Sequence, residues 1–149
     1  MAAVHQYMYF HFLCDDKGLD LLAGLFKRTA IEEMVHIEDL AERILFLGGE
    51  VNLKAAQDVQ PIKDVEKMLE MACEMERSSV MDYNKWALEC SQNFDAMSKQ
   101  IFEKLVADEE RHFDQYDTEL TNLNNFGDRY LALQSIERSK SLAAGNPGE

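Results

Sequence analysis

The chain carries EMVH at Glu33–His36 and EERH at Glu109–His112, two copies of the pattern Glu-x-x-His. Residues three apart lie on the same face of a helix, so the carboxylate and the imidazole of each copy can reach one metal ion. Oxygen and nitrogen ligands together suit iron, manganese or zinc. A single such pattern in an acidic helical protein is most often a coincidence of surface residues. Two of them, on two long helices, favour a metal site inside a helical bundle.

Both copies lie in stretches whose apolar residues recur every three or four positions, the period of an amphipathic helix. The first stretch begins at Leu19 and stops at Gly48-Gly49, and glycine commonly ends a helix. Its length of about 29 residues predicts a helix of about 44 Å. The second predicted helix runs from Ala96 to about Asn124 and is closed by Gly127.

Three further helices are predicted from the same periodicity, and no segment has the pattern of a strand. They cover residues 1–14, residues 64–91 with Asp64 as the N-cap, and residues 128–139. The segment 50–63 is too long for a tight turn and is interpreted as a crossover. Two helix pairs joined by one crossover predict an all-α, ferritin-like four-helix bundle with a short C-terminal fifth helix. We expect one domain over residues 1–142 and a disordered tail over residues 143–149.

The composition narrows the classes of partner. The chain has 28 acidic and 15 basic residues and a formal net charge of −13. Such a surface repels phosphate backbones and anionic lipids, so we expect the protein to bind neither nucleic acid nor membranes. No apolar run approaches the roughly 18 residues of a membrane span, and the first residues lack the pattern of a signal peptide. The three cysteines include no CxxC pair, which argues against a rubredoxin-type iron module and predicts a cytoplasmic protein.

A two-metal site in such a bundle also needs one glutamate from each of the other two helices. On the helix predicted for residues 64–91, Glu76 has apolar residues three, four and seven positions away and therefore lies on the apolar face. A buried carboxylate is costly unless it is paired or binds a metal, so we expect Glu76 to be a ligand and not a solvated surface acid.

The spacing also predicts where the sixth ligand belongs. If the two helix pairs are internal pseudo-repeats, the 33 residues from Glu76 to Glu109 should separate Glu33 from its own partner glutamate. That position falls just before Met1. The expectation is therefore either a chain shortened at its N-terminus or a site with five protein ligands.

At this point the sequence resembles the bacterioferritin family over nearly the whole chain. The resemblance is carried by HQY at 5–7, IEEMVH at 31–36, AERILFLGG at 41–49 and DEERH at 108–112. It implies an iron-storage subunit with a ferroxidase activity, which oxidises Fe(II) to Fe(III) with O2 or H2O2 at a di-iron site inside the bundle. The ferric product would be held as a mineral in a homo-oligomeric cage of about 24 subunits.

The resemblance also assigns the residues of this site. It implies that Glu33 and Glu109 bridge the two iron ions. Terminal ligands would be the imidazoles of His36 and His112 and the carboxylate of Glu76. Two other interpretations stay open. One is a rubrerythrin-like di-metal peroxidase or oxidoreductase that stores nothing, although a typical rubrerythrin carries the CxxC module that this chain lacks. The other is a structural bundle with an acidic surface.

Two more residues acquire a role from the resemblance. Tyr7 matches a tyrosine beside the di-iron site, where it can donate an electron or a hydrogen bond, or act as a plain core aromatic. Met34 matches the axial ligand of a haem b shared by two subunits. It lies one residue, or about 100°, round the helix from Glu33 and so faces away from the metal site; without haem it would pack in the interface. The chain differs from some members of the family at two positions. Arg28 stands where those members have a histidine, and Gln115 stands where they have a tryptophan.

Overall fold

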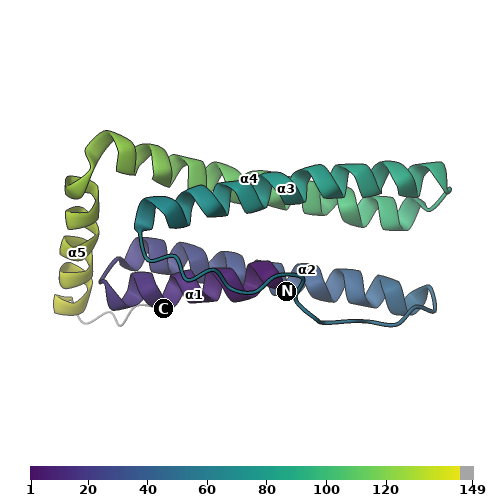
Figure 1. Ribbon diagram of the computed structural model, residues 1–149, viewed down its shortest axis with the longest axis horizontal. Helices are drawn as coiled ribbons and strands as arrows, with labels where there is room; N and C mark the ends of the chain where they lie inside the picture. Colours follow the sequence, from purple (N-terminus) through teal and green to yellow (C-terminus); the bar gives the residue numbers. More distant parts are fainter. Residues whose placement is uncertain (145–149) are drawn as a thin grey trace.

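The computed structural model describes residues 1–144 and contains five α-helices (Figure 1). The elements are α1 (Ala2–Asp16), α2 (Asp20–Phe46), α3 (Val65–Gln92), α4 (Ala96–Phe126) and α5 (Asp128–Ala143). No strand occurs in this part of the chain. The predicted all-α bundle with a fifth helix is therefore confirmed, and α5 extends beyond its predicted end at Ser139. Of the tail predicted to be disordered, residues 145–149 lie outside the described residues.

The helices form two antiparallel pairs, α1 with α2 and α3 with α4, stacked as two layers (Figure 1). The segment between α2 and α3 runs back along the first pair, as the predicted crossover requires, and α5 lies across one end of the bundle. The buried side chain of Gln6 fixes this crossover. Its Nε2 donates to the carbonyl of Gln60 at 3.1 Å, and its Oε1 accepts from the Gln60 amide at 2.7 Å.

Local sequence signals explain where the helices begin and end. The Asp64 side chain accepts a hydrogen bond from the Lys67 amide at 3.0 Å, and Asp95 does the same for Ser98 at the start of α4. These bonds satisfy amides that have no partner inside the helix. Gly48 follows α2 with a φ of 78°, a conformation that glycine adopts without strain.

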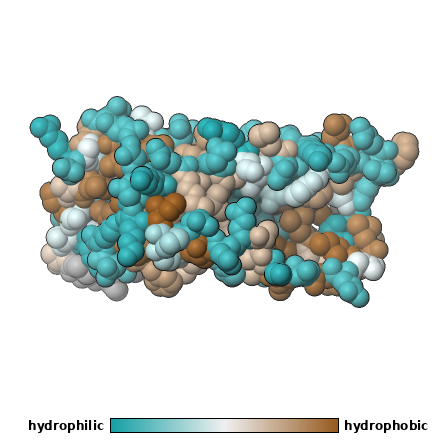
Figure 2. All heavy atoms as spheres, in the orientation of Figure 1, coloured by the Kyte–Doolittle hydropathy of each residue, from teal (hydrophilic) through white to brown (hydrophobic). Residues whose placement is uncertain are grey.

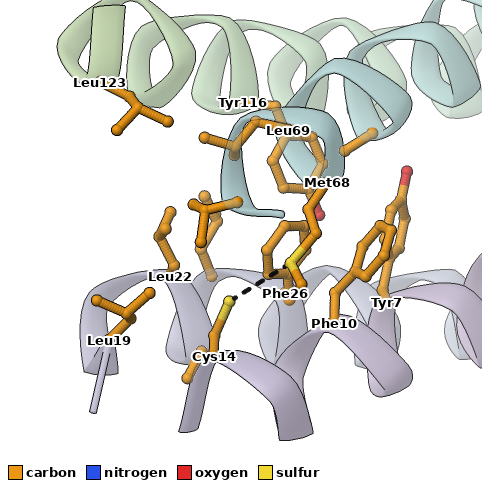
Figure 3. Packing of buried hydrophobic residues seen from close by; sticks show 14 of the residues in the cluster. Tyr7, Phe10, Cys14, Leu19, Leu22, Phe26, Met68, Leu69, Tyr116 and Leu123 are labelled. Carbon is orange, nitrogen blue, oxygen red and sulfur yellow. Dashed lines mark hydrogen bonds between the residues drawn. The ribbon is translucent and has the colours of Figure 1, made fainter. Parts of the chain in front are cut away.

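The core is aromatic where the two layers meet. Tyr7, Phe10, Phe26 and Tyr116 are fully buried, and Figure 3 shows them pointing toward one another from α1, α2 and α4. Ring centroids lie 5.2 Å apart for Phe10 and Phe26 and 5.3 Å apart for Phe26 and Tyr116. Cys14 packs in the same cluster, with its Sγ 4.0 Å from the sulfur of Met68 (Figure 3). This core fixes the positions of the helices on which the metal-binding residues are predicted.

The helix α5 supplies a cap that α2 lacks. No side chain next to the start of α2 caps that helix. Instead, Oε1 of the buried Gln134 accepts a hydrogen bond from the Leu22 amide at 3.3 Å. Arg138 of α5 adds an ion pair to Asp20 in the first turn of α2, at 2.8 Å. The fifth helix thus joins the bundle through contacts with the first turn of α2.

Replacing Gln134 by alanine is expected to lower the free energy of unfolding by about 1–2 kcal/mol, because the Leu22 amide then loses its partner in a buried position. The measurement is chemical denaturation of the iron-free protein at constant protein concentration. Gln100→Ala, which alters an exposed glutamine of α4, is the control and should leave stability unchanged. Equal stability of both variants would contradict the capping role of Gln134.

The surface is mainly polar on the face that Figure 2 shows, with hydrophobic side chains in patches near both ends of the bundle. At the end of α2 and at the turn between α3 and α4, Leu45, Phe46, Leu47 and Phe94 are exposed. Among the described helices, none is both long and apolar enough to cross a membrane.

Candidate metal centre

Four buried side chains meet between the two layers of the bundle. Glu33 comes from α2, Glu76 from α3, and Glu109 and His112 from α4. One ligand atom of each can be chosen so that all four atoms lie within 4.8 Å of one another. The sequence pattern explains the arrangement, because Glu109 and His112 are one helical turn apart and point to the same side of α4.

His36 faces the same group from α2. Its Nδ1 lies 3.3 Å from Glu109 Oε1 and 3.7 Å from Glu33 Oε2. Nδ1 of His112 lies 3.6 Å from Glu76 Oε2 and 3.8 Å from an oxygen of Glu33 and of Glu109. The structure thus brings together all five residues that the sequence predicts as metal ligands, and we call them the five-residue cluster.

The five-residue cluster has polar atoms that the described residues do not satisfy. Five buried atoms in it form no hydrogen bond: Nδ1 of His36, Nδ1 of His112, Glu76 Oε2, Glu109 Oε1 and Glu109 Oε2. Buried polar groups without partners cost stability, and native proteins rarely contain several in one place. Three carboxylates and two imidazoles also form a donor set that suits iron. The residues therefore fit a pair of metal ions.

The pKa values of the cluster also favour the binding of metal ions. Burial, followed by the carboxylates of Glu109 and Glu33, raises the pKa of Glu76 to about 8 even though His112 opposes the shift. Burial lowers the pKa of His112, but Glu109 and Glu76 outweigh it and raise the pKa to about 10. The pKa of His36 is likewise raised to about 10 by Glu109 and Glu33, against burial. Without metal, the protons held by Glu76 and by the two imidazoles offset the negative charge of the cluster, and bound cations would displace these protons.

Tyr7 connects the cluster to the aromatic core. Its hydroxyl donates a hydrogen bond to Glu76 Oε1, and its ring centroid lies 5.5 Å from that of Tyr116. Burial and the neighbouring Glu76 raise the pKa of Tyr7, which keeps the hydroxyl protonated. Tyr7 is therefore more than a packing residue, because it is the hydrogen-bond donor to a predicted terminal ligand.

Two acidic residues that the sequence interpretation did not single out bind the outer nitrogens of the histidines. Asp108 Oδ2 lies 3.2 Å from Nε2 of His36, and Glu32 Oε2 lies 2.8 Å from Nε2 of His112. Each acid comes from the helix opposite its histidine. A carboxylate on the outer nitrogen orients a metal-binding imidazole and makes it more basic. Their place in the sequence could have identified them, because Glu32 directly precedes Glu33 and Asp108 directly precedes Glu109.

Met34 does not belong to the cluster. Its side chain is 50% exposed, whereas that of the adjacent Glu33 is buried, so the two point to different sides of α2. A groove of about 450 Å³ leads from the surface toward the cluster. Its lining includes Glu33, Tyr83, Trp86 and Met1, which places the start of α1 beside the predicted metal site.

Known proteins show the same combination of fold and sequence. A family model described as a ferritin-like domain matches residues 1–126. The bacterioferritin of Desulfovibrio desulfuricans is 33% identical over 132 residues, which cover 89% of this chain and 74% of that protein. The bacterioferritin of Brucella melitensis is 34% identical over 136 residues, covering 91% of this chain and 84% of the relative.

A solved structure agrees with these relatives. The X-ray structure of Desulfovibrio desulfuricans bacterioferritin, described as showing its diiron site in different catalytic states, matches with a TM-score of 0.88 and 32% sequence identity. The match covers 90% of this chain and 78% of that one.

Proposed function

Because this chain belongs to the bacterioferritin family of ferritin-like proteins, we propose that it is a ferroxidase that oxidises Fe(II) to Fe(III) at the five-residue cluster. The observation that carries the proposal is the group of buried ligand atoms without hydrogen-bond partners between the two helix pairs. A structural bundle has no need of such a group, since apolar side chains in its place would be more stable.

Each member of the cluster has a proposed role. Glu33 and Glu109, which lie between the two histidines, would hold both iron ions. His36 and His112 would each bind one iron through Nδ1, and Glu76 would be a terminal carboxylate. A bound Fe(II) pair would supply two electrons to O2 or H2O2. The three carboxylates would offset the charge of the cations, and their burial between the helices strengthens this attraction.

Tyr7 is proposed to act on this site through Glu76. Its hydroxyl holds one oxygen of Glu76, which leaves the other oxygen free for metal. The ring is buried and contacts Tyr116, so it is also placed to donate an electron.

We propose that the protein stores the ferric product in a homo-oligomeric cage of about 24 copies in the cytoplasm. Ile31, Met34 and Val35 support contact between copies, because they expose apolar surface on consecutive turns of α2. Met34 is the proposed axial ligand of a haem b held between two copies. A half-exposed thioether on a side of α2 that faces away from the cluster fits that role, and the haem would transfer electrons. The free cysteines Cys14, Cys73 and Cys90 suit a reducing compartment.

Storage and assembly are tested together on a sizing column with light scattering, after aerobic addition of excess Fe(II). With chains of 17.1 kDa, we expect a particle on the order of 400 kDa that elutes with iron far above two ions per chain. A dimer or tetramer that oxidises iron but retains none would contradict storage. It would favour a non-storing di-metal oxidoreductase of the rubrerythrin type.

A further inference from the structure

One guanidinium contacts both acids that bind the histidines. Nη2 of Arg111 lies 2.5 Å from Glu32 Oε2 and 3.1 Å from Asp108 Oδ1. Glu32 is the partner of His112, and Asp108 is the partner of His36. A single side chain on α4 is therefore connected, through two carboxylates, to both predicted nitrogen ligands.

The bridge is not repeated in the other half of the chain. Arg111 occupies the third position of the second Glu-x-x-His, and the same position in the first copy is Val35. The acids, in contrast, are paired symmetrically, each binding the histidine of the opposite helix. One arginine thus serves two symmetric pairs. Because it binds Glu32 on α2 from α4, it also joins the two helices that carry the Glu-x-x-His motifs.

We propose that Arg111 is a positioning residue for both histidine ligands. It holds Glu32 and Asp108 in place, so that each imidazole keeps its outer nitrogen bonded to a carboxylate and turns Nδ1 toward the metal centre. Without Arg111, Glu32 and Asp108 lose the cation that both contact, and each carboxylate becomes freer to rotate away from its histidine. Arginine suits this task because its planar group offers several donors in fixed directions, whereas lysine is a single point charge. The inference rests on the proposed metal site.

The positive charge of Arg111 has an opposing effect, because it repels incoming cations. If charge alone mattered, removing Arg111 would strengthen metal binding. The side chain is 44% exposed, so solvent and salt screen its long-range field, while its contacts with the two carboxylates are direct. We therefore expect the positioning effect to be the larger one.

The test is a Co(II) titration of the iron-free, full-length protein, followed by the visible absorption of the bound cobalt, which reports ligand geometry. The parent protein should bind two Co(II) per chain. Arg111→Gln should bind them about 10-fold more weakly and with an altered spectrum, the effect expected when support of metal ligands is lost. Arg111→Lys keeps the positive charge but loses the planar guanidinium with its fixed donor directions. Its cobalt affinity should therefore lie between those of the parent protein and Arg111→Gln.

Lys104→Gln is the matched control, because Lys104 on α4 also forms an ion pair with α2, to Asp39 at 2.8 Å, without contacting Glu32 or Asp108. It should behave as the parent protein does. Circular dichroism and particle size confirm that each variant is folded. Unchanged or tighter cobalt binding by Arg111→Gln, with two Co(II) bound by the parent, would overturn this inference alone. A parent protein that binds no stoichiometric cobalt would overturn the proposed function and this inference with it.

Discussion

Replacing Glu33 and Glu109 together by alanine is expected to abolish fast oxidation of Fe(II), with a loss of at least about 100-fold in rate. The two carboxylates face both histidines and are the proposed bridges between the iron ions. Removing them leaves only Glu76 as a carboxylate ligand and takes away most of the negative charge that attracts the cations. The measurement is the stopped-flow absorbance of the ferric product after mixing with O2 or with H2O2.

A matched control removes the same number of charges from positions next to predicted ligands. Glu74→Ala with Glu110→Ala changes two exposed glutamates, each within two residues of Glu76 or Glu109. This control should oxidise iron at the parent rate, because neither side chain points into the bundle. If the Glu33→Ala, Glu109→Ala protein also kept the parent rate, the five-residue cluster would not be the oxidation site.

Phe26→Ala is expected to lower the free energy of unfolding by about 3–5 kcal/mol, the largest effect on stability among the changes considered. Phe26 is fully buried and stacks on Tyr116 and Tyr7, while Phe10 packs against it at a ring distance of 5.2 Å. Truncation leaves a cavity between α1, α2 and α4. Chemical denaturation of the iron-free protein measures the loss, at one protein concentration because assembly also stabilises the fold.

Phe94→Ala controls for the general effect of losing an aromatic ring. Phe94 is 96% exposed at the turn between α3 and α4, so its removal should change stability by less than about 0.5 kcal/mol. The Phe26→Ala protein should also oxidise iron more slowly, because the same aromatic cluster holds Tyr7 against Glu76. A loss of less than about 1 kcal/mol for Phe26→Ala would show that the cluster tolerates the cavity and does not order the bundle.

The site and the core share a boundary residue, and this links stability to function. Tyr7 packs in the core with its ring and binds Glu76 with its hydroxyl. Beyond the Tyr7 hydroxyl, the five-residue cluster holds buried carboxylates close together, and this arrangement is unfavourable without cations. Metal binding should therefore stabilise the protein as well as load it with substrate.

The amphipathic periodicity predicted the helices, and the repeated Glu-x-x-His predicted which faces would meet. The ends of α2 and α4 were predicted within two residues of their positions because Gly48 and Gly127 stop the helices for local reasons. The end of α5 was predicted too early, since no glycine or proline follows Ser139 at once to mark it. The disordered tail and the glutamate expected before Met1 stay predictions.

The sequence by itself determined the fold class and the five residues of the cluster, because both follow from the spacing of residues along one helix. Tertiary structure alone decided which side chains from different helices meet. It paired Asp108 with His36 and Glu32 with His112, brought Gln134 to the start of α2, and placed Arg111 on both acids. The helical period shows which face of a helix is buried. It does not show the rotation and height at which a neighbouring helix packs, and these contacts depend on both.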